Sequence, residues 1–209
     1  MKQLIWPSIM AKTQPELDQD LNKLKGAAKM LHLDIVDGQF AHNKTFQFPF
    51  KLSQHFHYNA HLMVKSPEKW VDQHGKKVDL IIFHPETAPD VSRLIKKIKA
   101  MKRKVGLALL PKTKVQSIKP YLNQIGFVLI LMVKPGFYGS KFLEKDLKKI
   151  AQLKTINPKI KVIVDGGMNP KTIKKARKAD FFISGSYTTK ADNPQKRINA
   201  LLQALDRSA

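Results

Sequence analysis

The 209-residue sequence contains no cysteine, which excludes disulfide bridges and thiolate chemistry. A membrane-spanning helix needs about 18 consecutive apolar residues, and no apolar run in this sequence comes close to that length. We therefore expect no association with a membrane. The apolar stretch at the N-terminus is too short for a secretory signal, because Pro7 interrupts it. These absences together lead us to expect a cytoplasmic protein.

Acidic residues are scarce: 16 Asp and Glu stand against 38 Lys and Arg, for a formal net charge of +22 at pH 7. Such a charge suits a nucleic-acid surface, or a lysine-rich solvated shell that also attracts a phosphorylated substrate. The basic residues are spread through several amphipathic segments and are not interleaved with aromatic residues as a stacking surface requires. We therefore favour the phosphorylated substrate and expect no nucleic-acid partner.

Short apolar runs alternate with amphipathic segments along the whole chain. We expect strands at residues 4–9, 31–36, 57–64, 78–83, 105–109, 127–133, 161–164 and 181–184. Helices are expected at 14–30 with Thr13 as N-cap, from Pro67 with Ser66 as N-cap, at 90–101, near 114–119, at 140–155, after Asn169-Pro170 and at 194–205.

Continuous apolar strands separated by helices are typical of a parallel sheet that is buried on both faces. Eight strand–helix units favour a closed (β/α)8 TIM barrel, of the α/β class, over an open doubly wound sheet. No linker or shift in composition divides the chain. We therefore expect residues 1–209 to form a single (β/α)8 barrel domain.

Four polar residues fall at the C-terminal ends of the expected strands, where barrel enzymes place their active sites. His32 and Asp34 alternate along strand 31–36 and so share one face, His61 lies in strand 57–64, and Asp165 follows strand 161–164. Two imidazoles and two carboxylates suit one divalent metal ion: Zn²⁺, Fe²⁺, Mn²⁺ or Co²⁺. Each residue alone is equally explained as a satisfied polar group, but all four at the same end favour a metal site.

Glycine-containing loops follow the last three expected strands. They contain Gly136 to Ser140, Gly166-Gly167 and Gly185-Ser186. Backbone amides without Cβ crowding can converge on a phosphate, and barrels often bind phosphate in the loops after strands seven and eight. The alternative is that these glycines only permit tight turns between strand and helix.

These motifs resemble those of the ribulose-phosphate 3-epimerase family, from Pro7-Ser8-Ile9 to Ser184-Gly185-Ser186. The matching stretches are residues 31–40 with Asn43, His61-Leu62-Met63-Val64, residues 135–142 and Val164-Asp165-Gly166-Gly167. The resemblance implies a TIM barrel of the ribulose-phosphate-binding type. It also implies a metal-dependent sugar-phosphate 3-epimerase that interconverts D-ribulose 5-phosphate and D-xylulose 5-phosphate.

The resemblance implies a metal held by His32, Asp34, His61 and Asp165. Asp34 and Asp165 would be the catalytic pair that exchanges protons with opposite faces of C3 through an enediolate. The implied substrate-binding residues are Ser8, His61, Met63, Gly136, Phe137, Tyr138, Gly139, Asp165, Gly166, Gly167, Gly185 and Ser186.

Several positions depart from the usual family pattern: Val36 and Leu131 stand where methionine is usual, and Tyr138 stands where a small residue is usual. Lys134 before Pro135 and Leu110 in place of the usual Asn before Pro111 are further departures. Two alternatives therefore stay open. One is a hexulose-phosphate (allulose 6-phosphate) 3-epimerase, and the other is a sugar-phosphate-binding barrel with weakened catalysis. The resemblance also allows a homo-oligomer.

Overall fold

The structure is a computed structural model that describes residues 3–135 and 141–206. Eight parallel strands pair side by side, and the pairing of β1 with both β9 and β2 closes them into a barrel. They are β1 (Ile5–Ile9), β2 (Met30–Asp37), β4 (His57–Met63), β5 (Leu80–Phe83), β6 (Lys104–Leu109), β7 (Phe127–Leu131), β8 (Lys161–Asp165) and β9 (Phe181–Ser184). The predicted (β/α)8 barrel is confirmed.

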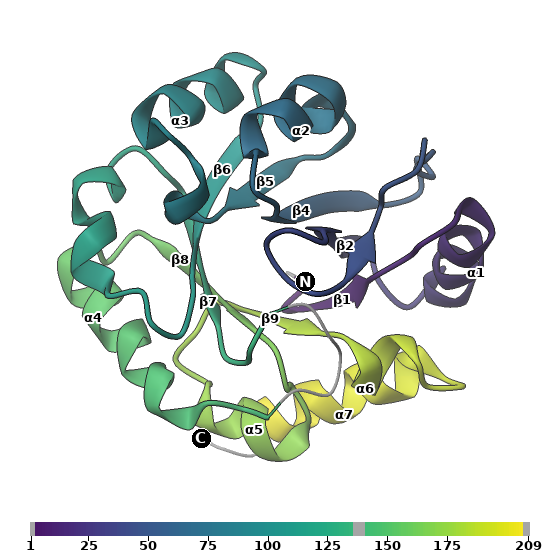
Figure 1. The fold of residues 1–209 in the computed structure, drawn as a ribbon. Coiled ribbons are helices and arrows are strands. Elements are labelled where there is room, and N and C mark those ends of the chain that lie inside the picture. Colours follow the sequence, from purple (N-terminus) through teal and green to yellow (C-terminus); the bar gives the residue numbers. More distant parts are fainter. Residues whose placement is uncertain (1–2, 136–140, 207–209) are drawn as a thin grey trace.

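Helices surround the strands on the outside (Figure 1). They are α1 (Gln14–Leu24), α2 (Pro67–His74), α3 (Val91–Ala100), α4 (Lys148–Ile156), α5 (Pro170–Lys175), α6 (Ser186–Thr189) and α7 (Pro194–Asp206). The described residues also form four 3-10 turns between strands and helices: η1 (Gly75–Lys77), η2 (Pro85–Thr87), η3 (Val115–Tyr121) and η4 (Glu144–Leu147). None of the helices in the described ranges has the length and apolar character needed to cross a membrane.

Several predicted helix boundaries are wrong. The helix expected at 14–30 ends at Leu24, because Lys25 is extended and Gly26 adopts a φ of +84°. The segment near 114–119 is the 3-10 turn η3, which contains Pro120. The helix expected at 140–155 begins at Lys148 after η4.

Helix starts were predicted with mixed success. Thr13 caps α1 as expected, its side chain accepting from the Glu16 amide at 3.3 Å. Pro67 opens α2 as expected, but the Ser66 side chain makes no capping hydrogen bond. Helix α6 and strand β3 (Lys44–Thr45), which pairs antiparallel with the end of β2, were not predicted.

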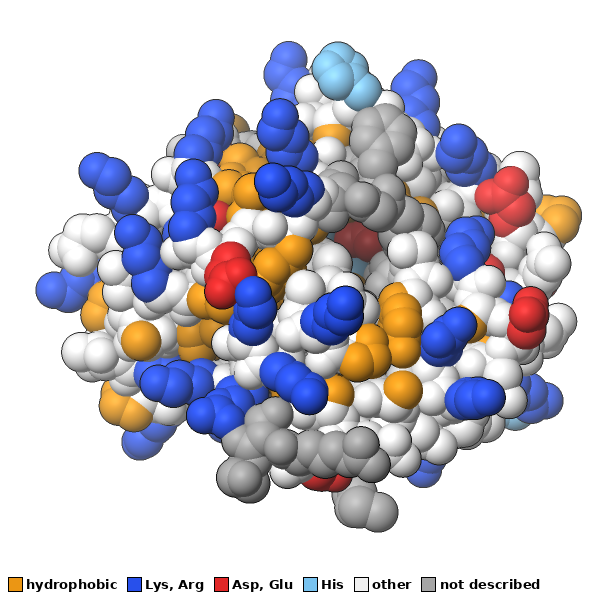
Figure 2. All heavy atoms as spheres, turned by 90° about the horizontal axis from the view of Figure 1, so that it is seen from below, with side chains coloured by type: hydrophobic (Ala, Val, Ile, Leu, Met, Phe, Trp, Pro, Cys, Tyr) orange, Lys and Arg blue, Asp and Glu red, His pale blue; other side chains and the backbone are white. Residues whose placement is uncertain are grey.

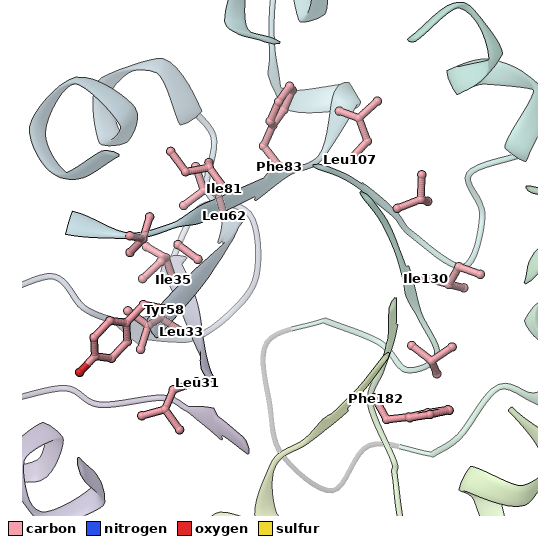
Figure 3. Packing of buried hydrophobic residues seen from close by; sticks show 14 of the residues in the cluster. Leu31, Leu33, Ile35, Tyr58, Leu62, Ile81, Phe83, Leu107, Ile130 and Phe182 are labelled. Atoms are coloured by element: carbon pink, nitrogen blue, oxygen red, sulfur yellow. The ribbon is translucent and has the colours of Figure 1, made fainter. Parts of the chain in front are cut away.

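Alternate residues of the strands face two different surroundings. One set packs outward against the helices. Figure 3 labels several of these side chains: Leu31, Leu33, Ile35, Tyr58, Leu62, Ile81, Phe83, Leu107, Ile130 and Phe182. The other set forms a second, smaller apolar cluster, to which Trp6, Leu80, Ile82, Ala108, Leu129, Ile163, Phe181 and Ile183 belong. Both faces of the strands are therefore buried, as their continuous apolar sequences predicted.

Candidate active site and metal centre

Strands β2 and β4 bring the residues of one face together in three matched pairs, two of which are polar. The parallel register sets His32 beside Asn59, Asp34 beside His61, and Val36 beside Met63. Because residues two apart on a strand share a face, these side chains all point to the same side of the sheet. That side carries the polar cluster, whereas the intervening residues Leu31, Leu33 and Ile35 join the outer apolar layer.

His32, Asp34, His61 and Asp165 each place one potential ligand atom within 4.8 Å of the others. His32 Nε2 lies 3.2 Å from Asp34 Oδ1 and 4.0 Å from Asp165 Oδ2. His61 Nδ1 lies 3.3 Å from Asp34 Oδ1 and 3.6 Å from Asp165 Oδ2. Both histidines are fully buried, and the two aspartates are only 6% and 8% exposed.

This arrangement fits a divalent metal ion. His32 Nε2 is buried and has no hydrogen-bond partner among the described residues. Two ligand atoms that each lie about 2.1 Å from a tetrahedral ion are about 3.4 Å apart. Three of the four nitrogen–oxygen separations in this cluster, 3.2, 3.3 and 3.6 Å, are close to that value, and the fourth is 4.0 Å. Two nitrogen and two oxygen donors suit Zn²⁺ and neighbouring transition metals, and the donor set leaves their identity undecided.

The charges in this cluster lower the pKa of Asp34 and raise the pKa of His61. Burial would raise the pKa of Asp34, but the neighbouring His32 and His61 rings hold this pKa well below its usual range. Burial would lower the pKa of His61, but hydrogen bonds with Asp165 and Asp34 raise this pKa to about 9. Without a metal, His61 therefore carries positive charge between the two carboxylates.

A cavity of about 440 Å³ opens beside the cluster. It is lined by eight of the predicted site residues: Ser8, Asp34, Met63, Asp165, Gly166, Gly167, Gly185 and Ser186. Figure 2 shows a hollow in one face of the molecule with an acidic side chain visible inside it, and Lys and Arg side chains scattered over the whole face. The structure thus brings two of the candidate metal ligands, Asp34 and Asp165, and two of the predicted phosphate loops to one space, whereas His32 and His61 lie behind the carboxylates and do not line it.

Gly166 and Gly167 have backbone conformations that L side chains rarely adopt, with φ values of +98° and +69°. A Cβ on Gly166 would lie 2.5 Å from Val133 Cγ2, and one on Gly167 would lie 3.2 Å from Phe142 Cβ. Both positions therefore require glycine for the loop itself. The predicted residues Gly136, Phe137, Tyr138 and Gly139 lie outside the described residues.

The sequence interpretation missed several residues around this site. The cavity is also lined by Met10, Leu131, Val133, Pro135, Phe142, Met168, Asn169, Thr172 and Tyr187. Asn59 contacts His32, and His84, at the end of β5, contacts His61. The position of Asn59 two residues before His61 was a signal, since it puts both side chains on the same face of β4.

Comparison with known proteins identifies the family. The profile of the ribulose-phosphate 3-epimerase family matches residues 4–189. The chain belongs to this family. Its members are epimerases, a class of isomerases, so the predicted family and enzyme class are confirmed.

Curated relatives match along almost their whole length. The ribulose-phosphate 3-epimerase of Schizosaccharomyces pombe is 31% identical over 208 residues, which cover 94% of this chain and 91% of that protein. The protein named ribulose-phosphate 3-epimerase, cytoplasmic isoform, of Oryza sativa subsp. japonica is 32% identical over 216 residues, covering 98% and 95%.

Solved structures share the fold at lower identity. The 3-keto-L-gulonate-6-phosphate decarboxylase of Vibrio cholerae has a TM-score of 0.71 and 14% identity, with both chains covered completely. The 3-hexulose-6-phosphate synthase of Salmonella typhimurium has a TM-score of 0.68 and 14% identity, covering 99% of this chain and 100% of that one. These likenesses support the barrel and nothing finer.

Proposed function

We propose that this protein is a metal-dependent epimerase that interconverts D-ribulose 5-phosphate and D-xylulose 5-phosphate. One observation carries the proposal: two buried carboxylates from different strands, Asp34 and Asp165, line the same cavity and share His61 as a neighbour. Inversion at a carbon requires a proton to leave one face and another to arrive at the opposite face. Two carboxylates at one cavity suit that requirement.

Asp34 and Asp165 would be the catalytic pair, one removing the C3 proton and the other returning a proton from the far side. The low pKa of Asp34 means that it begins as a carboxylate, ready to accept a proton. Both carboxylates line a cavity that is open to the surface, so the one that returns the proton would exchange it with solvent between turnovers.

One divalent ion (Zn²⁺, Fe²⁺, Mn²⁺ or Co²⁺) would be held by His32, Asp34, His61 and Asp165. When bound, it would supply a Lewis acid that stabilises the negative charge of the enediolate. The set includes both proposed proton carriers, so binding the ion would also fix their carboxylates in position.

The other predicted residues would bind the substrate. Ser8, His61 and Met63 would contact the sugar end, while backbone amides of Gly166, Gly167, Gly185 and Ser186 would receive the phosphate. Gly136, Phe137, Tyr138 and Gly139 are proposed phosphate-loop residues on the sequence resemblance alone. The basic surface would attract this anionic substrate.

The proposal is tested by exchange at C3. The purified protein is stripped with a chelator, reloaded with each metal in turn, and incubated with D-ribulose 5-phosphate in D₂O under NMR observation. We expect xylulose 5-phosphate carrying deuterium at C3, and no product from Asp34→Asn. A folded, metal-loaded wild-type protein that gives neither product nor exchange would contradict the proposal.

The same assay separates the hexulose alternative. D-allulose 6-phosphate is offered in parallel, and a higher kcat/KM for it than for ribulose 5-phosphate would favour the hexulose-phosphate epimerase. We also propose a cytoplasmic location, which the name of the rice relative supports. A homo-oligomer stays a prediction for sedimentation measurements.

A further inference from the structure

Each histidine of the metal cluster uses a different ring nitrogen towards the carboxylates. His32 presents Nε2, which is 3.2 Å from Asp34 Oδ1. His61 presents Nδ1, which is 3.3 Å from the same oxygen. The remaining nitrogen of each ring faces a buried residue outside the cluster, Asn59 for His32 and His84 for His61.

Asn59 can offer His32 only an oxygen. Its amide nitrogen Nδ2 donates to the Leu31 carbonyl at 3.1 Å, which fixes the orientation of the side-chain amide. Its Oδ1 therefore faces His32 Nδ1, and because a carbonyl oxygen only accepts, Nδ1 must donate. A neutral ring that donates from Nδ1, the form that binds a metal, keeps the lone pair on Nε2, the nitrogen with no hydrogen-bond partner in the described chain.

His84 stands in the matching position for His61. The two Nε2 atoms are 2.9 Å apart, so one ring donates and the other accepts. If His61 Nδ1 gives its lone pair to a metal, its Nε2 carries the hydrogen and donates to His84. His84 is fully buried, and the Phe40 ring covers it at a centroid distance of 4.6 Å.

The register of β2 and β4 explains why the two rings use opposite nitrogens. His32 is level with Asn59, whereas His61 is level with Asp34, two residues further along the barrel. His32 lies two residues before Asp34, so its ring must reach further along the barrel to the carboxylates. It does so with Nε2, the ring nitrogen that is more distant from the backbone. His61 lies beside Asp34 and reaches the same carboxylate oxygen with Nδ1.

We infer that Asn59 and His84 are positioning residues that select the metal-binding nitrogen of each histidine, Nε2 of His32 and Nδ1 of His61. The inference rests on the proposed metal site. Metal-bound histidines commonly donate their other ring N–H to such a partner, and losing that partner typically weakens metal binding about 10- to 100-fold.

The direct test uses the intact wild-type protein with ¹⁵N-labelled histidine and ¹¹³Cd²⁺ as the metal. We expect one-bond coupling of ¹¹³Cd to Nε2 of His32 and to Nδ1 of His61. Coupling to the opposite nitrogen of either ring would overturn the inference and leave the metal site intact. No cadmium binding at all would overturn both the inference and the proposed metal site.

Variants test the partners separately, with Zn²⁺ affinity measured by competition with a chelator. Asn59→Leu and His84→Leu should each weaken Zn²⁺ binding about 10- to 100-fold, whereas Asn59→Asp and His84→Gln keep an acceptor and should retain most of the affinity. The control is Leu80→Ala, which opens a space beside Asn59 in the register. It should lower the melting temperature without a comparable loss of affinity.

Unchanged Zn²⁺ affinity in both leucine variants would overturn the inference. So would an equal loss in Leu80→Ala, because the effect would then follow stability alone. If a leucine variant does not fold, the coupling pattern of the wild-type protein still decides.

Discussion

Two groups of charged side chains are buried among the residues that the structure describes, and they differ in how their charges are matched. Outside the barrel, Lys149 of α4 contacts Asp146 at 2.9 Å and donates to the carbonyls of Leu110 and Pro111 at 2.9 and 2.8 Å. The ammonium group has three hydrogens, and each has an acceptor. One cation therefore meets one anion, and the pair joins α4 to the loop after β6.

Inside the barrel, the charges are unequal. Asp34 and Asp165 are two carboxylates, and only the histidines His32 and His61 face them. Because the pKa of His61 is raised, its ring carries one positive charge, which balances only one of the two carboxylates. His32 Nε2 has no hydrogen-bond partner in the described part of the chain. Burial of charge is common to both groups, so burial does not mark the functional one; the unmatched negative charge does.

The largest expected difference between the groups is in catalysis. Asp165→Asn removes one proposed proton carrier, so we expect kcat to fall by about 10²- to 10⁴-fold with KM little changed, since the phosphate loops remain. The measurement is C3 exchange with ribulose 5-phosphate at saturating metal. The matched control, Asp146→Asn, makes the same acid-to-amide change at the other buried group.

Asp146→Asn should retain the wild-type kcat and show a lower melting temperature instead. Full activity in Asp165→Asn would refute the two-carboxylate mechanism. A comparable loss of kcat in both variants would show that the two buried groups do not differ in the way proposed here.

The second expected effect is on stability. Lys149→Met leaves Asp146 as an uncompensated buried charge, so we expect the free energy of unfolding to fall by about 3–5 kcal/mol. Urea unfolding measures this loss, while kcat/KM of the folded variant should stay at the wild-type value. Adding Asp146→Leu should restore part of the stability, and a further large loss in the double variant would contradict the pairing.

Much of the fold followed from the sequence because buried strands are continuous apolar runs. All eight barrel strands were predicted, and Phe181–Ser184 has the predicted bounds. Helix ends were harder, since the end of α1 depends on the backbone at Lys25 and Gly26 and not on apolar spacing. Strand β3 and helix α6 are too short to give a periodic signal.

The four metal-cluster residues could be predicted from two patterns that are visible in the sequence. Alternate residues of a strand share a face, and barrel enzymes place their active sites at the C-terminal ends of the strands. The partners of these residues could not be predicted. Nothing in the sequence says that the Asn59 amide is held by the Leu31 carbonyl, or that His84 and His61 approach to 2.9 Å. These contacts depend on the register between neighbouring strands, which a single chain does not reveal.

Metal addition should sharpen the comparison further. At a Zn²⁺ concentration about 100 times its Kd, we expect the free energy of unfolding to rise by about 2.7 kcal/mol, because the ion binds only the folded state. Lys149→Met should show the same gain over its own lower baseline, since its defect lies outside the site. Asp34→Asn should show little gain, and a full gain there would place the stabilising ion elsewhere.

The smallest effect is expected at a third ion group, which is partly exposed. Burial would raise the pKa of Asp180, but hydrogen bonds from Lys154 Nζ at 2.6 Å and the Val162 amide at 2.9 Å lower this pKa from its usual value of 3.8. Because the folded-state pKa is the lower one, the carboxylate contributes stability above about pH 4, and the contribution is lost as the pH falls through the folded-state pKa.

Asp180→Asn should therefore cost about 1 kcal/mol in the free energy of unfolding at neutral pH, less than Lys149→Met because solvent screens this group. Urea unfolding at a series of pH values should show the difference from wild type shrinking towards zero below about pH 4. A difference that stays constant into acid would mean that Asp180 acts through packing and not through its charge. A shrinking difference would instead show that the contribution comes from the ionised carboxylate and the groups that donate to it, Lys154 and the Val162 amide.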